Sequence, residues 1–211
     1  MWALIQDDKI KQIITYPTNI EIDNVKHSSK IFNAWTWEEL NAIGIYQVIP
    51  ASRGDDRFEQ TTNQTFTFDA SKKQVTMSYT ITDKPLDDAE AKDSDGKNIL
   101  DEDGNKVINY GLKTMAIAQA KKEADMLIKR FGWLVERSIY DSSKAIPDAV
   151  KTYVTAIRNN AATIETAITN ASDMDAFKAL YVEERNSDGS IKTQAKIYDW
   201  TDDANVETYI R

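Results

Sequence analysis

The chain has 211 residues, of which 41% are hydrophobic and 28% are charged, and its formal net charge is −8. This composition is typical of a globular protein, and the length is sufficient for one larger domain or two small ones. We expect no membrane-spanning helix, because no apolar run approaches the roughly 20 residues that such a helix needs. The acidic balance argues against nucleic acid as a partner, since clustered Lys and Arg are needed to bind its phosphates.

Cysteine and histidine usage narrows the possible chemistry further. The chain has no Cys, so we expect no disulfide, no thiolate metal site and no cysteine nucleophile. The single histidine, His27, cannot form a zinc site that needs two or three imidazoles. Residues 1–8 lack the basic and apolar regions of a signal peptide. We therefore expect a soluble protein made in a cytoplasm, without cofactor, metal or membrane partner.

The first 84 residues predict a small β-rich module. Residues 2–6 and 10–16 are β-branched and aromatic runs on either side of a polar turn, which is typical of a hairpin. A third short strand follows at residues 20–22. Thr36 and Glu39 form a capping box before a short helix, which we expect to end at Gly44 in the left-handed conformation.

Further strands are predicted in the rest of this module. Residues 45–49 form one of them, and residues 65–68 and 74–81 form a second hairpin, because apolar side chains alternate along both runs. The charged stretch between them, residues 51–62, is predicted to be a loop. Trp35 and Trp37 are expected to pack over the sheet, although a pair of indoles could also hold a ligand.

Two similar acidic turns follow, at residues 93–96 and 101–104. Each ends in Asp-Gly, the dipeptide most typical of a hairpin turn. A calcium loop of the EF-hand type would need Gly at its sixth position and Glu at its twelfth, and neither turn has this spacing. We expect hairpin turns here, and whether they also bind a cation stays open.

Two long helical patterns dominate residues 111–171. Apolar residues recur every three or four positions, which predicts an antiparallel helical hairpin with a turn at Pro147. Gly132 interrupts the first pattern, and the spacing slightly favours continuation of the helix to Tyr140. The expected inner faces consist of Ile117, Ala120, Ala124, Leu127, Ile128, Phe131, Leu134 and Val135, and of Ile146, Val150, Tyr153, Ile157, Ala161, Ile164 and Ile168.

The end of the chain predicts three smaller elements. Ser172 or Asp173 caps a short helix in which Phe177 faces inward. A hairpin follows with its turn at residues 186–189. The last residues, 200–211, are acidic with isolated aromatic side chains, and we expect them to dock on a partner.

Catalytic motifs are missing from the sequence. It has no Gly-rich phosphate loop, nucleophile elbow or H-E-x-x-H pattern. Carboxylates are plentiful, but no pair stands out as the facing acid and base of a glycosidase. We expect no enzyme, and a carbohydrate-active enzyme that uses paired carboxylates remains an alternative.

One stretch resembles a known family. Residues 127–137, 145–147, 153 and 156–158 are similar to the C-terminal part of bacteriophage tail-fibre assembly proteins and related tail-associated proteins of tailed phages. The family pattern is kept at Trp133, Arg137, Pro147, Tyr153 and Arg158. The sequence departs from it at Gly132, where Asp is usual, and at Val154, where Arg usually follows Tyr. The front half resembles proteins common in phages of marine bacteria.

The resemblance implies a non-enzymatic bacteriophage structural protein of the tail or tail-fibre region, present in the virion and made in the host bacterial cytoplasm. It would act through contacts with other tail or fibre proteins in an oligomeric assembly. A tail-fibre assembly chaperone that leaves before the virion matures is the alternative. The expected partner-binding residues are Trp2, Ile13, Trp35, Trp37, Trp133, Arg137, Tyr153 and Arg158.

The fold class expected from these patterns is α+β. A small β-rich N-terminal module, residues 1–84, is followed by an antiparallel helical hairpin with flanking strands, residues 85–211.

Overall fold

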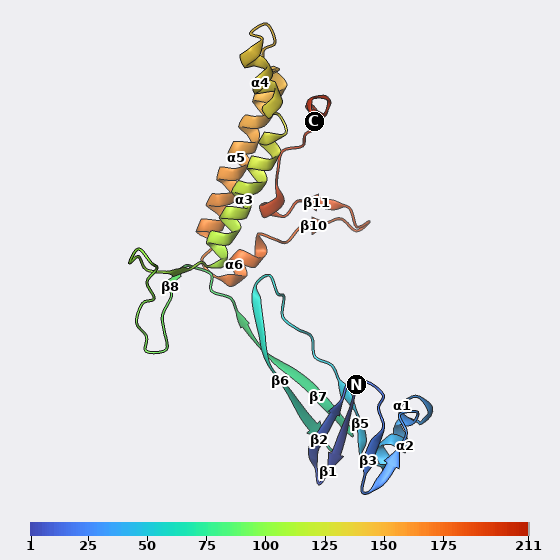
Figure 1. Cartoon of the computed structure of the whole chain (residues 1–211). Helices are drawn as coiled ribbons and strands as arrows, with labels where there is room; N and C mark the ends of the chain where they lie inside the picture. The colour runs from blue at the N-terminus through green and yellow to red at the C-terminus, as the bar shows by residue number, and fades with distance from the viewer. Residues whose placement is uncertain (211) are drawn as a thin grey trace. The chain divides into compact units, whose positions relative to one another are not determined.

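Strands dominate the first part of the chain and helices the second, as Figure 1 shows for the computed structural model, which describes residues 1–210. The α+β class is therefore confirmed. The chain divides into an N-terminal unit, Met1–Asp83, and a C-terminal unit, Lys84–Arg211. The sequence analysis places this division one residue later. None of the helices in the described residues is long and apolar enough to cross a membrane.

A five-stranded sheet with the order β2-β1-β5-β7-β6 forms the N-terminal unit. Its neighbouring strands are antiparallel except for β5 and β7, which run parallel with Val48 opposite Val75. The β1–β2 turn uses positive φ angles at Asp7 and Asp8, 50° and 56°, and such angles are typical of the turns that join two twisted strands. The strands are β1 (Trp2–Gln6), β2 (Lys9–Ile14), β5 (Ile45–Ile49), β6 (Glu59–Asp69) and β7 (Gln74–Asp83).

Both faces of this sheet carry buried apolar side chains. Ala3 and Ile5 of β1 belong to one cluster with side chains of β5 and β7, whereas Leu4 belongs to another on the opposite face. This follows from the two-residue period of a strand. Four short elements contribute to the Leu4 cluster or flank it: β3 (Ile20–Ile22), β4 (Val25–His27), α1 (Ile31–Ala34) and α2 (Trp37–Ala42).

The capping box before α2 is confirmed. The Glu39 backbone N–H donates to the Thr36 hydroxyl at 3.3 Å, and the Thr36 N–H donates to the Glu39 carboxylate at 2.7 Å. Gly44 after α2 has a φ of +80°, as expected. A Cβ at Gly44 would lie 2.7 Å from the Ile5 carbonyl oxygen, so this position requires glycine both for its conformation and for its close contact with β1.

The prediction of a loop over residues 51–62 was wrong at its end. β6 begins at Glu59, and residues 59–62 pair with residues 83–80 of β7. The side chains of this part of β6 are polar on both faces, so the alternation that marks a half-buried strand is missing. Asn63, with a φ of +47°, interrupts the register between this part and the predicted strand.

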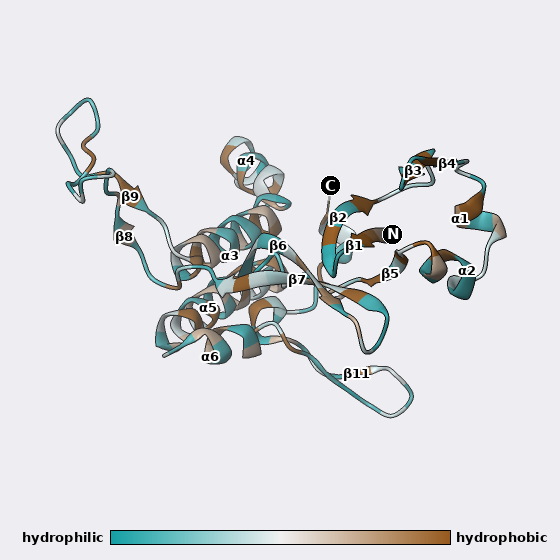
Figure 2. Ribbon diagram, turned by 90° about the horizontal axis from the view of Figure 1, so that it is seen from below, coloured by the Kyte–Doolittle hydropathy of each residue, from teal (hydrophilic) through white to brown (hydrophobic). Residues whose placement is uncertain are grey.

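Two long helices lie side by side and antiparallel in the C-terminal unit: α3 (Leu112–Lys129) and α5 (Asp148–Asn170) (Figure 1). The predicted inner face of α5 is buried from Val150 to Ile168. Alanines form most of the buried face of α3, which suits close packing of two helices. The helical hairpin is confirmed. Figure 2 colours the same elements by hydropathy.

The first long helix does not continue to Tyr140. α3 ends at Lys129 and a separate helix, α4 (Gly132–Tyr140), begins three residues later. Phe131, between the two helices, has a φ of −105° and a ψ of 4°, which departs from helical values. The break changes which side chains face inward. Leu134 is fully buried, whereas Val135, which was predicted on the inner face, is 48% exposed.

The last described residues, 200–210, pack on their own unit; that they also dock on a partner stays a prediction. Val206 is 1% exposed and belongs to the cluster formed by the long helices. The Arg130 guanidinium pairs with the Asp203 carboxylate. Two short helices flank or belong to this end of the chain: η1 (Lys196–Tyr198) and η2 (Glu207–Tyr209). They follow α6 (Met174–Ala179) and the predicted hairpin of β10 (Glu184–Arg185) and β11 (Ile191–Thr193).

Residues 89–109 form an arm that precedes α3. Its base pairs β8 (Ala89–Glu90) with β9 (Ile108–Asn109). Beyond the base, Ala91, Ile99 and Val107 hydrogen-bond in a ring: each backbone N–H donates to the carbonyl of another member, at 2.8–2.9 Å. These residues recur at every eighth position, and the two predicted Asp-Gly turns lie between them.

The two turns of the arm are confirmed as hairpin turns. Gly96 and Gly104 have φ angles of 79° and 82°. The Asp93 carboxylate accepts the N–H groups of Asp95 and Lys97, and Asp101 accepts the corresponding groups in the second turn. These carboxylates therefore serve the turns themselves. Among residues 1–210, no group of three or more His, Asp or Glu side chains could hold a metal ion.

Candidate partner-binding site

The break between α3 and α4 creates a corner against the first turns of α5. Four of the predicted partner-binding residues belong to these elements: Trp133 and Arg137 on α4, and Tyr153 and Arg158 on α5. The sequence could predict that these residues lie at one corner, because a helical hairpin places the end of its first helix next to the start of its second.

The inner layer of the corner is fully packed. Phe131 and Leu134 are 3% and 0% exposed, and the Phe131 ring meets Tyr153 edge-on with 5.5 Å between centroids. Tyr153 itself is 5% exposed, so it belongs to the core beneath the corner rather than to the surface. Burial raises the pKa of the Tyr153 phenol, and the Arg130 charge acts in the opposite direction.

Trp133 and Arg137 form a second layer at the side of the corner. The half-buried Trp133 indole donates its Nε1–H to the carbonyl of Tyr209 at 3.0 Å. The Arg137 guanidinium carbon lies 5.1 Å from the centroid of the Trp133 ring, a favourable cation–π distance. Trp133 is thus held between the chain end and Arg137.

An apolar groove of about 410 Å³ lies at the same corner, and we call it the corner groove; neither Trp133 nor Arg137 lines it. Its apolar lining comes from all three segments of the corner: Ile128, Phe131, Val135, Ile146, Val150 and Val154. Farther along α4, Ile139 and Tyr140 are 73% and 91% exposed. Apolar surface that stays open in this way is typical of sites that receive another protein segment.

Cationic side chains also line the corner groove: Lys129, Lys151 and Arg158. Lys129 pairs with Asp125 at 2.6 Å and Lys151 with Asp148 at 2.9 Å, both in exposed positions where such pairs are weak. The Lys151 ammonium lowers the pKa of Asp148. Arg158 has no ion pair within the part of the chain that the structure describes.

The other four predicted residues lie in the N-terminal unit. Trp2 is half-buried and its ring lies 4.8 Å from that of Phe32, centroid to centroid. Ile13 packs against the Ala3 cluster. Trp35 and Trp37 are 37% and 43% exposed, which is more than the expected packing over the sheet would leave open. These four side chains are not part of the corner groove.

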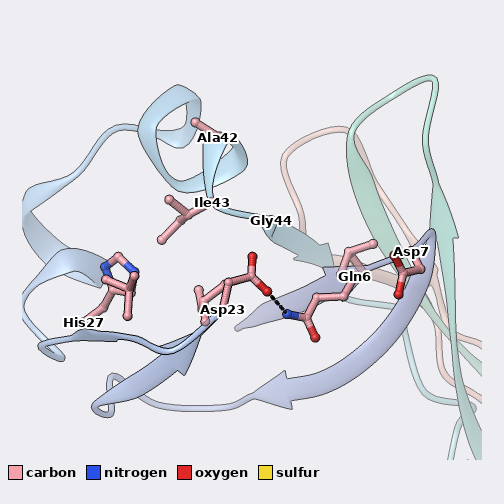
Figure 3. A pocket seen from close by; sticks show the side chains of 10 residues that line it. Gln6, Asp7, Asp23, His27, Ala42, Ile43 and Gly44 are labelled. Atoms are coloured by element: carbon pink, nitrogen blue, oxygen red, sulfur yellow. Dashed lines mark hydrogen bonds between the residues drawn. The ribbon is translucent and has the colours of Figure 1, made fainter.

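A second cavity, of about 700 Å³, lies in the N-terminal unit between two hairpin turns (Figure 3). Gln6, the last residue of β1, donates its Nε2–H to Oδ1 of Asp23, in the other turn, at 3.1 Å. His27 also lines the cavity and meets the Trp35 ring edge-on at 5.9 Å. Asp23 has a φ of +51°, so its side chain is placed by the demands of a tight turn.

The corner groove itself was not predicted. Ile128 and Val135 were expected in the core, and Val154 was identified only as a departure from the phage pattern. One signal was present in the sequence: Val154 directly follows the buried Tyr153 and lies outside the apolar stripe of α5. An apolar residue beside a stripe predicts apolar surface next to the core.

Comparison with known proteins adds no relative: no protein-family model, curated protein or solved structure matches the chain.

Proposed function

We propose that this protein is a non-enzymatic structural protein of a bacteriophage tail or tail fibre and that it acts through protein–protein contacts at the corner groove. The observation that carries the proposal is the convergence of the phage-like residues on one corner. Arg158 lines the groove, Tyr153 contacts the groove residue Phe131, and Trp133 and Arg137 stack on each other on α4 outside the groove lining.

The lining of the corner groove supports binding of a protein segment. Side chains of α4 and α5 leave a hollow in which Val135 is 48% exposed. An amphipathic segment could bury its apolar side chains between the two helices, as in other helix-in-groove complexes. The fixed positions of Phe131 and Leu134 beneath the groove limit the entropy lost on binding.

Mass spectrometry of purified particles from the source phage tests the proposed function. We expect the protein to be present in the particles at a fixed ratio to the major capsid protein, and that ratio gives its copy number. Absence from particles, together with abundance in the lysate, would contradict a virion component. That result would favour the tail-fibre assembly chaperone.

A further inference from the structure

We infer that the corner groove of one copy receives the arm of a second copy, so that the chain assembles head to tail. This inference rests on the proposed function of the groove as a contact surface and names its occupant. The segment that would enter the groove is residues 99–103, Ile-Leu-Asp-Glu-Asp.

The arm presents apolar side chains next to carboxylates. Ile99 and Leu100 are 43% and 57% exposed, although the first of them belongs to the hydrogen-bonded ring of the arm. Asp101, Glu102 and Asp103 follow directly, and all three are exposed. Figure 2 shows hydrophobic residues interrupting the otherwise hydrophilic arm.

The chemistry of the corner groove is complementary to that of the arm. The groove has an aliphatic floor and is lined by Lys129, Lys151 and Arg158, and no acidic residue lines it. Lys129 and Lys151 make weak exposed ion pairs with Asp125 and Asp148, whereas Arg158 makes none within the described residues. Attraction between these cations and the arm carboxylates would orient the segment while Ile99 and Leu100 enter the groove.

The arm is held in position before it binds. Glu90 at its base accepts hydrogen bonds from Lys106 at 2.5 Å and from Asn98 at 2.8 Å. Asp88 joins the base to the start of α3, because its carboxylate accepts the Gly111 N–H at 2.7 Å and the Thr114 hydroxyl at 3.0 Å. A segment fixed in this way loses little entropy on docking.

The geometry of the C-terminal unit excludes docking within one copy. The arm joins α3 at its N-terminal end (Figure 1), whereas the lining of the corner groove includes Ile128 and Lys129 at the C-terminal end of α3. α3 has 18 residues, which at about 1.5 Å per residue separates the two by roughly 27 Å. Contact between copies would leave one free arm at one end of each linear assembly and one free groove at the other. Such heterologous contacts build rings or filaments.

Two variants and their mixture test this inference. The groove variant is Val154→Asp with Arg158→Glu, and the arm variant is Leu100→Ser with Glu102→Lys. Sedimentation velocity gives the masses, and circular dichroism checks that each variant is folded. We expect the wild-type mass to rise with concentration, whereas each variant alone stays at the 23.9 kDa of one chain.

The mixture is decisive because each variant keeps one intact surface. The intact arm of the groove variant fits the intact groove of the arm variant, so an equimolar mixture should form a dimer and no larger species. A matched control, Val182→Ser with Glu184→Lys, changes an exposed apolar residue and a nearby carboxylate on another hairpin and should assemble like the wild type.

Three results would overturn the inference: a wild-type protein that stays monomeric up to about 1 mM, folded variants that assemble like the wild type, or a mixture that stays monomeric. The particle experiment separates this failure from failure of the proposed function. If the protein is present in particles yet monomeric in solution, the proposed function stands and only the inference about the arm falls.

Discussion

Neighbouring aromatic residues at the corner serve different purposes. Tyr153 and Phe131 are core residues, and their substitution would disturb the packing of α3 on α5. Trp133 is half-buried and joins α4 to the chain end through its hydrogen bond to Tyr209. The residues predicted to bind a partner thus include a core residue of the corner, Tyr153, and a residue that lines the groove, Arg158.

Trp133→Ala should lower the free energy of unfolding by about 2–4 kcal/mol, because it removes a large half-buried ring and a hydrogen bond. Trp133→Phe keeps much of the packing and loses the N–H donor, so we expect a smaller loss of about 1 kcal/mol. Chemical denaturation measures both values. A loss below about 1 kcal/mol for Trp133→Ala would mean that the chain end does not depend on this ring.

Tyr153 predicts a loss of stability at alkaline pH. Burial holds the pKa of its phenol above the usual value, so the folded state resists ionisation more than the unfolded state does. The resulting stabilisation is complete below the unfolded-state pKa of about 10 and is lost as pH rises through the folded-state pKa. The free energy of unfolding of Tyr153→Phe should therefore decrease less than that of the wild type between about pH 9 and pH 11. This range brackets the unfolded-state pKa of about 10.

Equal losses for the wild type and Tyr153→Phe in denaturant titrations would show that Tyr153 does not carry the effect. Absorbance of tyrosinate provides an independent check, because one tyrosine should ionise at a higher pH in the folded protein than in the unfolded protein.

At the scale of elements, α3 begins without a capping side chain of its own. Its N-cap residue is Gly111, and the linker before the arm supplies the missing acceptors. The Leu112 N–H donates to the Pro85 carbonyl at 2.9 Å, and the Lys113 N–H donates to that of Leu86 at 3.0 Å. The Asp88 carboxylate completes this set through Gly111. These hydrogen bonds thereby join the start of the C-terminal unit to the first turn of α3, the first helix of the helical hairpin.

Asp88→Ala should destabilise the start of α3 by about 1 kcal/mol, the usual cost of losing a capping side chain. Hydrogen exchange should show faster exchange at Gly111 and in the first turn, whereas α5 keeps its protection. Asp87→Ala is a suitable control, because the Asp87 carboxylate makes an ion pair with the Lys113 side chain, whereas the Gly111 N–H donates to Asp88. Similar exchange in both variants would contradict the capping by Asp88.

The sequence could predict the elements whose patterns are local. The apolar stripe of α5, the Thr36 capping box and the Asp-Gly turns all follow from spacing within a few residues. The sequence could not predict the corner groove, because the groove depends on how α4 turns after Phe131. The packing of Val206 on the helices and the hydrogen-bonded ring of the arm also join residues that no local pattern relates. Four of the eight expected contact residues nevertheless lie at the corner.

At the scale of the whole molecule, each unit has a hydrophobic core of its own. The N-terminal clusters contain Leu4 and Val75, and the C-terminal cluster contains Leu134 and Ile157. The arm and the corner groove both belong to the C-terminal unit, so this unit carries both surfaces that the proposed assembly needs. The head-to-tail assembly inferred above therefore needs no surface of the N-terminal unit.

Assembly between copies should weaken as salt concentration rises. The cations lining the groove and the carboxylates of the arm attract each other over distances that salt screens, with a Debye length of about 10 Å at 0.1 M and about 3 Å at 1 M. Light scattering at fixed protein concentration should show a decreasing average mass across this range. A mass that stays constant or increases would mean that charge does not guide the contact.

Cysteine cross-linking tests the central claim, contact at the corner groove, most directly, because the natural chain has no cysteine. A variant with Leu100→Cys in the arm and Val135→Cys in the groove is treated with a short bis-maleimide and separated by mass. The account predicts a ladder of covalent multimers from this variant and a single dimer band from a mixture of the two single variants. A product that stays monomeric, or a ladder equally strong with Val182→Cys in place of Leu100→Cys, would contradict it.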